Sequence, residues 1–195
     1  MKKLAVLFPG IGYHADKPLL YYSQKLLRSM DYEVMPLTYA PLPQEREQAV
    51  RQALVSARQA LAGVPFAQYG EIVLVGKSIG TCVAGVIGGD LSECLPEIRI
   101  RNVFFTPVTQ PLPRMTADTL VLSGTADPLA DQTLLRAACT AAGALLHTVL
   151  QGNHSLETPD VMQNLKILYD ALEWERKFLV DRKDVANTKE SRVKK

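Results

Sequence analysis

Hydrophobic and polar positions along this chain follow two patterns that alternate from one end to the other. Short apolar runs rich in β-branched residues, such as Ile72–Val75, are typical of buried strands. Longer stretches, such as residues 44–61, repeat apolar side chains every three or four positions, which is typical of helices that cover a sheet. The alternation predicts an α/β protein with a mostly parallel sheet.

Six strands and five helices follow from this pattern. The predicted strands are Lys3–Phe8, Glu33–Leu37, Glu71–Val75, Val103–Thr106, Thr119–Leu122 and Leu145–Leu150. The predicted helices are Pro18–Ser29, Gln44–Leu61, Ile79–Gly88, Asp131–Ala142 and Pro159–Phe178, the last with Thr158 as its cap. Because helices between parallel strands cover both faces of a sheet, we expect a three-layer α/β/α sandwich with about six strands.

Length and charge indicate one globular domain with a basic tail. A chain of 195 residues with 47% hydrophobic residues can bury about 70% of its unfolded surface in one core. Net charge is only +2, yet residues 176–195 carry eight Lys or Arg against three Asp or Glu. We expect a single domain over residues 1–180 and a frayed basic tail over 181–195. The tail has no interleaved aromatic residues, so we expect neither a nucleic acid nor a membrane as partner.

The cysteines and the N-terminal stretch bear on location. Cys82, Cys94 and Cys139 are an odd set without C-x-x-C spacing, which favours reduced thiols over a disulfide framework or a zinc site. The apolar stretch after Lys3 is too short for a signal peptide and runs into Pro9, so we interpret it as a strand. The chain is predicted to be cytoplasmic, without a metal or another cofactor, and its oligomeric state stays open.

The strongest chemical signal is the segment Gly76-Lys77-Ser78-Ile79-Gly80, directly after a buried strand and before a helix. A serine between two glycines at such a junction matches the G-x-S-x-G nucleophile elbow. Its turn strains the serine backbone, and the small flanking residues let strand and helix approach closely. The alternative is that Ser78 is an ordinary helix N-cap.

Partners for a serine nucleophile are expected where other parallel strands end, at the same edge of the sheet. Asp127 follows the fifth predicted strand and His154 follows the sixth. The alternatives are that Asp127 only forms a turn, with Asp131 as the other candidate acid, and that His154 is a solvent-facing loop residue. His147 falls inside a predicted strand, where a packing role is expected.

In these features the chain resembles the α/β-hydrolases, and among them the small, cap-less serine esterases and dienelactone-hydrolase-like proteins. Four segments carry the resemblance in the right order and at the right strand ends: Pro9–Gly12, Gly76–Gly80, Gly124–Asp127 and Gly152–His154. It extends from Leu4 to about Phe178. Members of that fold usually have eight strands, and this chain begins at what would be the third. The resemblance therefore implies a minimal six-stranded core without a cap domain.

The resemblance also implies roles for individual residues. Ser78 would attack an acyl carbonyl, His154 would act as general base and then general acid, and Asp127 would orient the imidazole. The backbone N–H groups of Ile79 and Ile11 would form the oxyanion hole. Dienelactone hydrolases proper use a cysteine nucleophile, so the serine here is a departure from that branch.

Three more residues are expected near the substrate, namely Gly12, His14 and Lys77. Lys77 and His14 favour tolerance for an anionic substrate. The predicted function is a serine hydrolase that cleaves a small carboxylic ester, thioester or related acyl substrate and belongs to the carboxylic ester hydrolases. Two alternatives remain, a catalytically silent binding or scaffold protein with the same fold and an acyltransferase.

Two phosphate-binding motifs are partial matches. A P-loop has four residues between its two glycines, before a Lys and a Ser or Thr. Here five residues separate Gly70 from Gly76, which precedes Lys77-Ser78, and those five form the predicted strand itself. The segment Gly10–Ala15 fits the dinucleotide fingerprint, but Pro18 starts the helix too late for a pyrophosphate site and Glu33 opens its strand instead of ending it. Neither motif explains the serine elbow.

Overall fold

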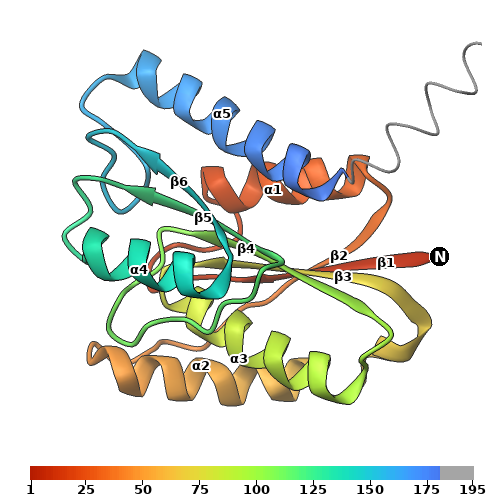
Figure 1. The fold of residues 1–195 in the computed structure, drawn as a ribbon. Coiled ribbons are helices and arrows are strands. Elements are labelled where there is room, and N and C mark those ends of the chain that lie inside the picture. Colours follow the sequence, from red (N-terminus) through yellow and green to blue (C-terminus); the bar gives the residue numbers. More distant parts are fainter. Residues whose placement is uncertain (181–195) are drawn as a thin grey trace, which may run out of the picture.

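The computed structural model describes residues 1–180, so the predicted basic tail over 181–195 lies outside the described residues. One sheet with helices on both faces makes up the described part (Figure 1). The strands are β1 (Lys2–Phe8), β2 (Tyr32–Pro36), β3 (Tyr69–Lys77), β4 (Arg99–Phe105), β5 (Thr119–Gly124) and β6 (Leu145–Val149). The helices are α1 (Pro18–Ser29), α2 (Arg46–Leu61), α3 (Ile79–Cys94), α4 (Gln132–Ala142) and α5 (Val161–Leu179), with a short 3₁₀ helix at Phe66–Gln68.

All six strands are parallel to their neighbours, in the order β2-β1-β3-β4-β5-β6. Helices α1 and α5 cover one face, and α2, α3 and α4 cover the other (Figure 1). The predicted fold class is therefore confirmed, including the number of strands. The chain order reverses between β1 and β3, and in such sheets a crevice for ligands opens outside the carboxyl ends of the strands at this point.

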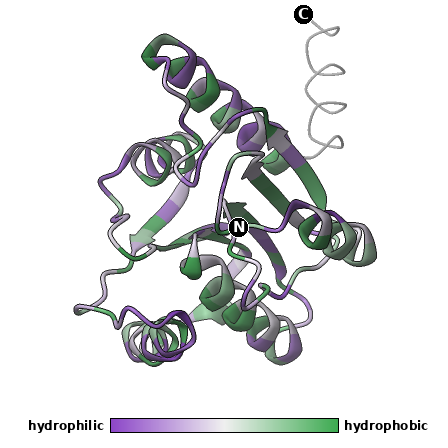
Figure 2. Ribbon diagram, turned by 90° about the vertical axis from the view of Figure 1, so that its left-hand side faces the viewer, coloured by the Kyte–Doolittle hydropathy of each residue, from purple (hydrophilic) through white to green (hydrophobic). Residues whose placement is uncertain are grey.

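Two apolar layers hold the helices to the sheet, because successive side chains of a strand point to opposite faces. Phe8, Leu74 and Phe104 are fully buried toward α2 and α3, whereas Val75 and Phe105 are fully buried toward α1 and α5. The central strands are thus apolar on both sides. Figure 2 shows the surrounding helices with hydrophobic and hydrophilic residues on the same helix, as the sequence periodicity predicts.

Helix α3 is longer than predicted and ends at Cys94 instead of Gly88. The predicted end, Gly88, is the first of two adjacent glycines. In the structure these glycines serve close packing: a side-chain carbon on Gly88 would lie 3.1 Å from Leu74, and one on Gly89 would lie 2.4 Å from Arg114. Tertiary contacts therefore override the low helix propensity of glycine here.

Strand β4 and helix α5 also differ from prediction at their starts. β4 begins at Arg99, four residues earlier than expected, because the charge of Arg101 is paired inside the protein with Glu71. α5 begins at Val161 after Asp160, whose side chain accepts hydrogen bonds from the N–H groups of the first turn. Over residues 1–180, none of the helices has the length and apolar character needed to cross a membrane.

Candidate active site

Ser78 stands alone between the last residue of β3 and the first residue of α3. Its φ of 56° lies in the left-handed region that side chains rarely adopt. A side-chain carbon on Gly76 would lie 2.6 Å from the backbone of Thr81, and one on Gly80 would lie 2.1 Å from the carbonyl oxygen of Phe8. Both glycines of the motif are therefore required for this tight junction. The Ser78 hydroxyl makes no capping hydrogen bond to α3, so the N-cap interpretation is wrong.

Three side chains from distant loops meet at the carboxyl edge of the sheet. Ser78 Oγ lies 2.8 Å from His154 Nε2. On the other side of the same ring, His154 Nδ1 lies 2.7 Å from Asp127 Oδ2. Ser78 is only 7% exposed and the carboxylate of Asp127 is fully buried, whereas the His154 side chain is 25% exposed. The predicted three residues thus form one continuous hydrogen-bonded chain that opens to solvent at the imidazole.

Asp127 is held by the turn that follows β5. Its second oxygen, Oδ1, accepts a hydrogen bond of 2.9 Å from the N–H of Leu129. This bond orients the carboxylate, so Oδ2 points to His154. Asp131, the other candidate acid, instead caps α4 by accepting from the N–H groups of Thr133 and Leu134. The aspartate that contacts the histidine is therefore Asp127.

The loop that carries His154 is organised by its neighbour Asn153, which the sequence analysis did not single out. Asn153 Oδ1 accepts hydrogen bonds from the N–H groups of Ser155 and Glu157, at 2.7 and 3.1 Å. The backbone N–H of Asn153 donates to the carbonyl of Glu157. An asparagine that bonds backbone two residues ahead is a known turn former, and this was the available signal.

The two predicted oxyanion-hole residues, Ile79 and Ile11, lie in segments next to Ser78. Ile79 is the first residue of α3, where an N–H has no carbonyl partner within its own helix. Ile11 lies in a tight turn closed by reciprocal hydrogen bonds between Gly10 and Tyr13. Gly10 is packed against the nucleophile loop, since a side-chain carbon there would lie 2.9 Å from Ser78 Cβ. The two predicted donors therefore belong to the segments that flank Ser78.

Lys77 does not line the substrate site, which corrects the expectation from the sequence. Its side chain points to the α1 and α5 face of the sheet and is only 1% exposed. The ammonium lies 4.7 Å from the centre of the Tyr13 ring. Burial lowers the pKa of Lys77 to about 7, and the carboxylate of Asp127 opposes this shift. With its head group buried, Lys77 cannot recognise an anionic substrate.

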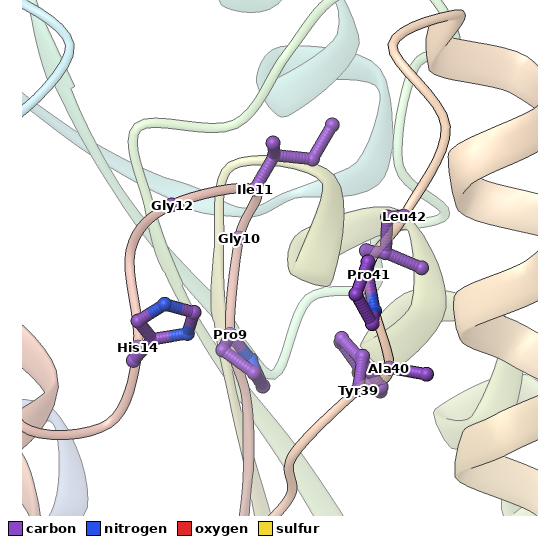
Figure 3. Close-up of a pocket in the computed structure, with 9 residues that line it drawn as sticks. All are labelled: Pro9, Gly10, Ile11, Gly12, His14, Tyr39, Ala40, Pro41 and Leu42. Carbon is purple, nitrogen blue, oxygen red and sulfur yellow. The ribbon is translucent and has the colours of Figure 1, made fainter.

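A cavity of about 310 Å³ opens beside the Gly10 turn (Figure 3). Three predicted residues, Ile11, Gly12 and His14, lie in its wall. The opposite wall is the segment Tyr39–Leu42 after β2, which the sequence analysis missed. The signal was present, since this segment also follows a parallel strand at the carboxyl edge of the sheet.

The remaining candidates have structural surroundings. His147 stacks on Trp174 with ring centres 4.5 Å apart, as expected for a packing role, and burial lowers its pKa. Cys82 and Cys139 are buried free thiols, and Cys94 is an exposed one. Within residues 1–180 no three His, Cys, Asp or Glu side chains gather closely enough to hold a metal ion.

The architecture matches proteins of known structure. No protein-family model and no curated protein sequence matches this chain. Among solved structures, a Xanthomonas campestris pv. campestris protein described as a hydrolase of the alpha/beta superfamily superposes with a TM-score of 0.67 at 17% identity. The match covers 91% of this chain and 99% of that one. The chain has the α/β-hydrolase fold.

Two further structures support this conclusion about the fold. A hydrolase from Agrobacterium vitis S4 has a TM-score of 0.68 at 14% identity over 92% of this chain and 88% of its own. A second Xanthomonas campestris protein, described as an a/b serine hydrolase without lid, has a TM-score of 0.53 at 14% identity over 88% and 82%. The α/β-hydrolase fold predicted from four short segments is confirmed. The narrower esterase branch stays a prediction.

Proposed function

We propose that this protein is a serine hydrolase that cleaves a carboxylic ester, thioester or related acyl substrate through an acyl-enzyme. The observation that carries the proposal is the hydrogen-bonded chain from Ser78 Oγ through both ring nitrogens of His154 to Asp127, with distances of 2.8 and 2.7 Å. A strained, uncapped serine at a strand-to-helix junction adds support, because such strain is usual where a nucleophile is held for reaction.

In the acylation step, Nδ1–H of His154 donates to Asp127, which leaves Nε2 free to accept the proton of the Ser78 hydroxyl. Ser78 Oγ then attacks the carbonyl carbon and the carbonyl oxygen becomes negative. The imidazolium returns its proton to the leaving oxygen or sulfur, and the acyl group stays on Ser78. Buried Asp127 stabilises the positive ring during this step.

The developing oxyanion is assigned to the backbone N–H groups of Ile79 and Ile11. One such donor is typically worth about 3 kcal/mol of transition-state stabilisation. In the second step, water gives a proton to His154 Nε2 and attacks the acyl carbonyl, which releases the acid and restores Ser78. The partly exposed imidazole gives water a route to this position.

A fluorophosphonate probe tests the proposal directly. We expect labelling at Ser78 alone, and hydrolysis of p-nitrophenyl acetate by the unmodified protein. Ser78→Ala should abolish labelling and lower kcat by a factor on the order of 10⁶, the size found for loss of a triad serine. Ser92→Ala is the matched control, since Ser92 Oγ only donates to the carbonyl of Gly88 within α3.

Folded protein that neither reacts with the probe nor hydrolyses esters would overturn the proposal and leave a binding or scaffold role. A labelled Ser78 with product formed on an added alcohol, faster than on water, would instead indicate an acyltransferase. Labelling and ester hydrolysis thus separate the binding role from a hydrolase, and the competition with an added alcohol separates the acyltransferase.

A further inference from the structure

We infer that the cavity between the Gly10 turn and the segment Tyr39–Leu42 is the binding site for the acyl chain of the substrate, and that this chain is uncharged and apolar. The inference rests on the proposed function and goes beyond it, since it assigns a substrate class and a place for one half of the ester. Four observations carry it, namely contact with the nucleophile, position in the sheet, composition of the wall, and size.

The cavity adjoins the nucleophile loop at Gly10. Gly10 lines the cavity, and a side-chain carbon on it would lie 2.9 Å from Ser78 Cβ and 3.6 Å from Ser78 Oγ. Ile11, the residue whose N–H is assigned to the oxyanion hole, lines the same cavity. An acyl group bound to Ser78 with its oxygen at Ile11 would therefore lie next to this cavity, whose wall at Gly10 and Ile11 is drawn in Figure 3.

The strand order decides which half of the ester lies here. The order β2-β1-β3-β4-β5-β6 places the loops after β1 and β2, which build the cavity, on one side of Ser78. Asp127 and His154 come from the loops after β5 and β6, on the other side. Because His154 must protonate the leaving group, the leaving group lies on the β6 side. The acyl chain is then directed to the β2 side, into the cavity.

The wall of the cavity favours an apolar chain. Its nine lining residues contain no Asp, Glu, Lys or Arg: they are Pro9, Gly10, Ile11, Gly12, His14, Tyr39, Ala40, Pro41 and Leu42. The hydrophobic side chains of Ile11 and Leu42 lie in this wall, and Ile11 is 44% exposed, so it presents apolar surface to whatever occupies the cavity. With the Lys77 ammonium buried away from this wall, His14 is the one basic side chain among the nine lining residues, so the wall holds no permanent positive charge to balance a carboxylate on the chain.

A volume of about 310 Å³ is at the small end of ligand pockets, so it suits a short or medium acyl chain better than a long lipid. Each methylene buried in such a wall raises kcat/KM by about fourfold at most, until the cavity is filled. The inference therefore predicts a rise from acetate to hexanoate and no further rise for much longer chains.

The experiment uses p-nitrophenyl acetate, butyrate, hexanoate and dodecanoate, together with the isomers ethyl hexanoate and hexyl acetate. We expect kcat/KM to rise about tenfold from butyrate to hexanoate and then to level off. Ethyl hexanoate should be the better isomer, since its long chain is on the acyl side. Ala40→Trp, which places an indole in the cavity at an exposed position, should lower the hexanoate-to-acetate ratio by about tenfold.

Leu165→Trp is the matched control. Leu165 is exposed on α5 and lines a separate cavity of about 330 Å³ next to Leu156, beyond the His154 loop. This variant should keep the hexanoate-to-acetate ratio of the unmodified protein. A ratio that changes in Leu165→Trp and not in Ala40→Trp, or a preference for hexyl acetate, would place the long chain on the other side and overturn the inference.

The remaining outcomes separate the inference from the proposed function. Hydrolysis of acetate without any dependence on chain length would refute the acyl site and leave the hydrolase intact. Absence of hydrolysis for every ester, with Ser78 unlabelled by fluorophosphonate, would refute both. Labelling of Ser78 in Ala40→Trp by a small fluorophosphonate shows that this variant is folded and its nucleophile is active.

Discussion

Two buried cations lie on the same face of the sheet, at opposite ends. Lys77 closes β3 at the carboxyl edge, and Arg101 lies in the first half of β4. Both are almost inaccessible, at 1% and 3% exposure, and both lie over an aromatic ring. The Lys77 ammonium is 4.7 Å from the ring centre of Tyr13, and the Arg101 guanidinium is 4.4 Å from that of Phe178.

Their polar partners differ. Arg101 contacts the carboxylate of Glu71 at 3.2 Å and donates to the carbonyls of Leu179 and Phe178 at the end of α5. Within residues 1–180, no carboxylate lies within 4.0 Å of the Lys77 ammonium, which lies over the ring of Tyr13 instead. A buried cation in an ion pair holds two elements together, whereas a buried cation without an ion pair opposes folding.

The two ends of the sheet therefore differ in role, since one stabilises the fold and the other carries the candidate site. The amino-terminal half holds α5 in place through the ion pair of Arg101 with Glu71 and the hydrogen bonds of Arg101 to the last carbonyls of the helix. The carboxyl edge collects a strained backbone at Ser78 and a buried ammonium at Lys77, each of which is unfavourable for stability. Such departures from good packing are expected where function has been selected over stability. Four variants test this difference, from the largest expected effect to the smallest.

The first variant is Asp127→Asn, at the carboxyl edge. The amide keeps the shape of the side chain but cannot hold His154 in the required tautomer, so kcat should fall by a factor on the order of 10⁴. Ester hydrolysis measures this loss, and denaturant unfolding should show a much smaller effect. Asp131→Asn is the control, because asparagine caps a helix about as well as aspartate and Asp131 only caps α4. Equal losses in both variants would contradict the assignment of Asp127.

The second variant is Arg101→Ala, in the amino-terminal half. It leaves the Glu71 carboxylate and the last carbonyls of α5 without their partner, so unfolding free energy should fall by about 3 kcal/mol. At temperatures where Arg101→Ala is folded, its kcat should stay within about twofold of the kcat of the unmodified protein. Arg58→Ala removes an exposed ion pair with Asp90 and should cost at most about 1 kcal/mol. A large loss of kcat in folded Arg101→Ala would break the comparison.

The third variant is Lys77→Met. The folded protein holds the Lys77 pKa at about 7, below its value of 10.5 in the unfolded chain, so between these values the unfolded state binds more protons. Stability of the unmodified protein therefore rises with pH across this window. Methionine removes the penalty, and we expect a gain on the order of 3 kcal/mol at pH 6 that shrinks toward pH 10.

Denaturant unfolding at several pH values measures this difference between Lys77→Met and the unmodified protein. Lys25→Met is the control, since Lys25 also lies over a tyrosine ring, 5.4 Å from the centre of Tyr21, but is exposed. It should give no comparable gain at any pH. A gain for Lys77→Met that does not depend on pH would show that the buried charge is not its cause.

The fourth variant is Glu175→Gln, in the interface between α1 and α5. The Glu175 carboxyl accepts a hydrogen bond of 2.6 Å from Ser23, its other oxygen has no partner, and burial raises its pKa to about 7. Between pH 4.5 and about 7 the folded state binds more protons at Glu175 than the unfolded state does. The free energy of unfolding of the unmodified protein therefore falls as pH rises through this window. Glutamine should be stabilising by on the order of 1 kcal/mol at pH 8 and by less at pH 4. A larger gain in unfolding free energy at pH 4 than at pH 8 would contradict the assignment of a buried charge to Glu175.

The sequence predicted most elements because their periodicity was clear, and α1 was predicted with its observed bounds. The failures have physical causes in tertiary contacts. The helix predicted to end at Gly88 continues to Cys94, and Gly88 and Gly89 lie inside it, where a neighbouring strand and Arg114 pack too closely for any side chain. The strand predicted to begin at Val103 begins at Arg99 and includes Arg101, whose charge is paired with Glu71 on the neighbouring strand.

At the candidate site, local motifs predicted which residues take part, but they did not predict what packs around those residues. The elbow glycines, Asp127 and His154 could be selected because their chemistry and chain order are recognisable from short segments. The burial of Lys77 could not be predicted, since it depends on Tyr13 and two helices folding over the end of β3. The wall at Tyr39–Leu42 was missed because nothing in its residue types indicates a site.

The sequence alone determined the succession of strands and helices along the chain, because periodicity is a property of neighbouring residues. It also determined the residues able to carry out acyl chemistry, because local turn chemistry is readable from short segments. Distances of 2.8 and 2.7 Å between groups from three loops were decided only by the tertiary structure. The same holds for the buried ammonium and for the cavity on the β2 side. Their cause is the packing of parallel strands, which brings to one edge loops that are far apart in the chain.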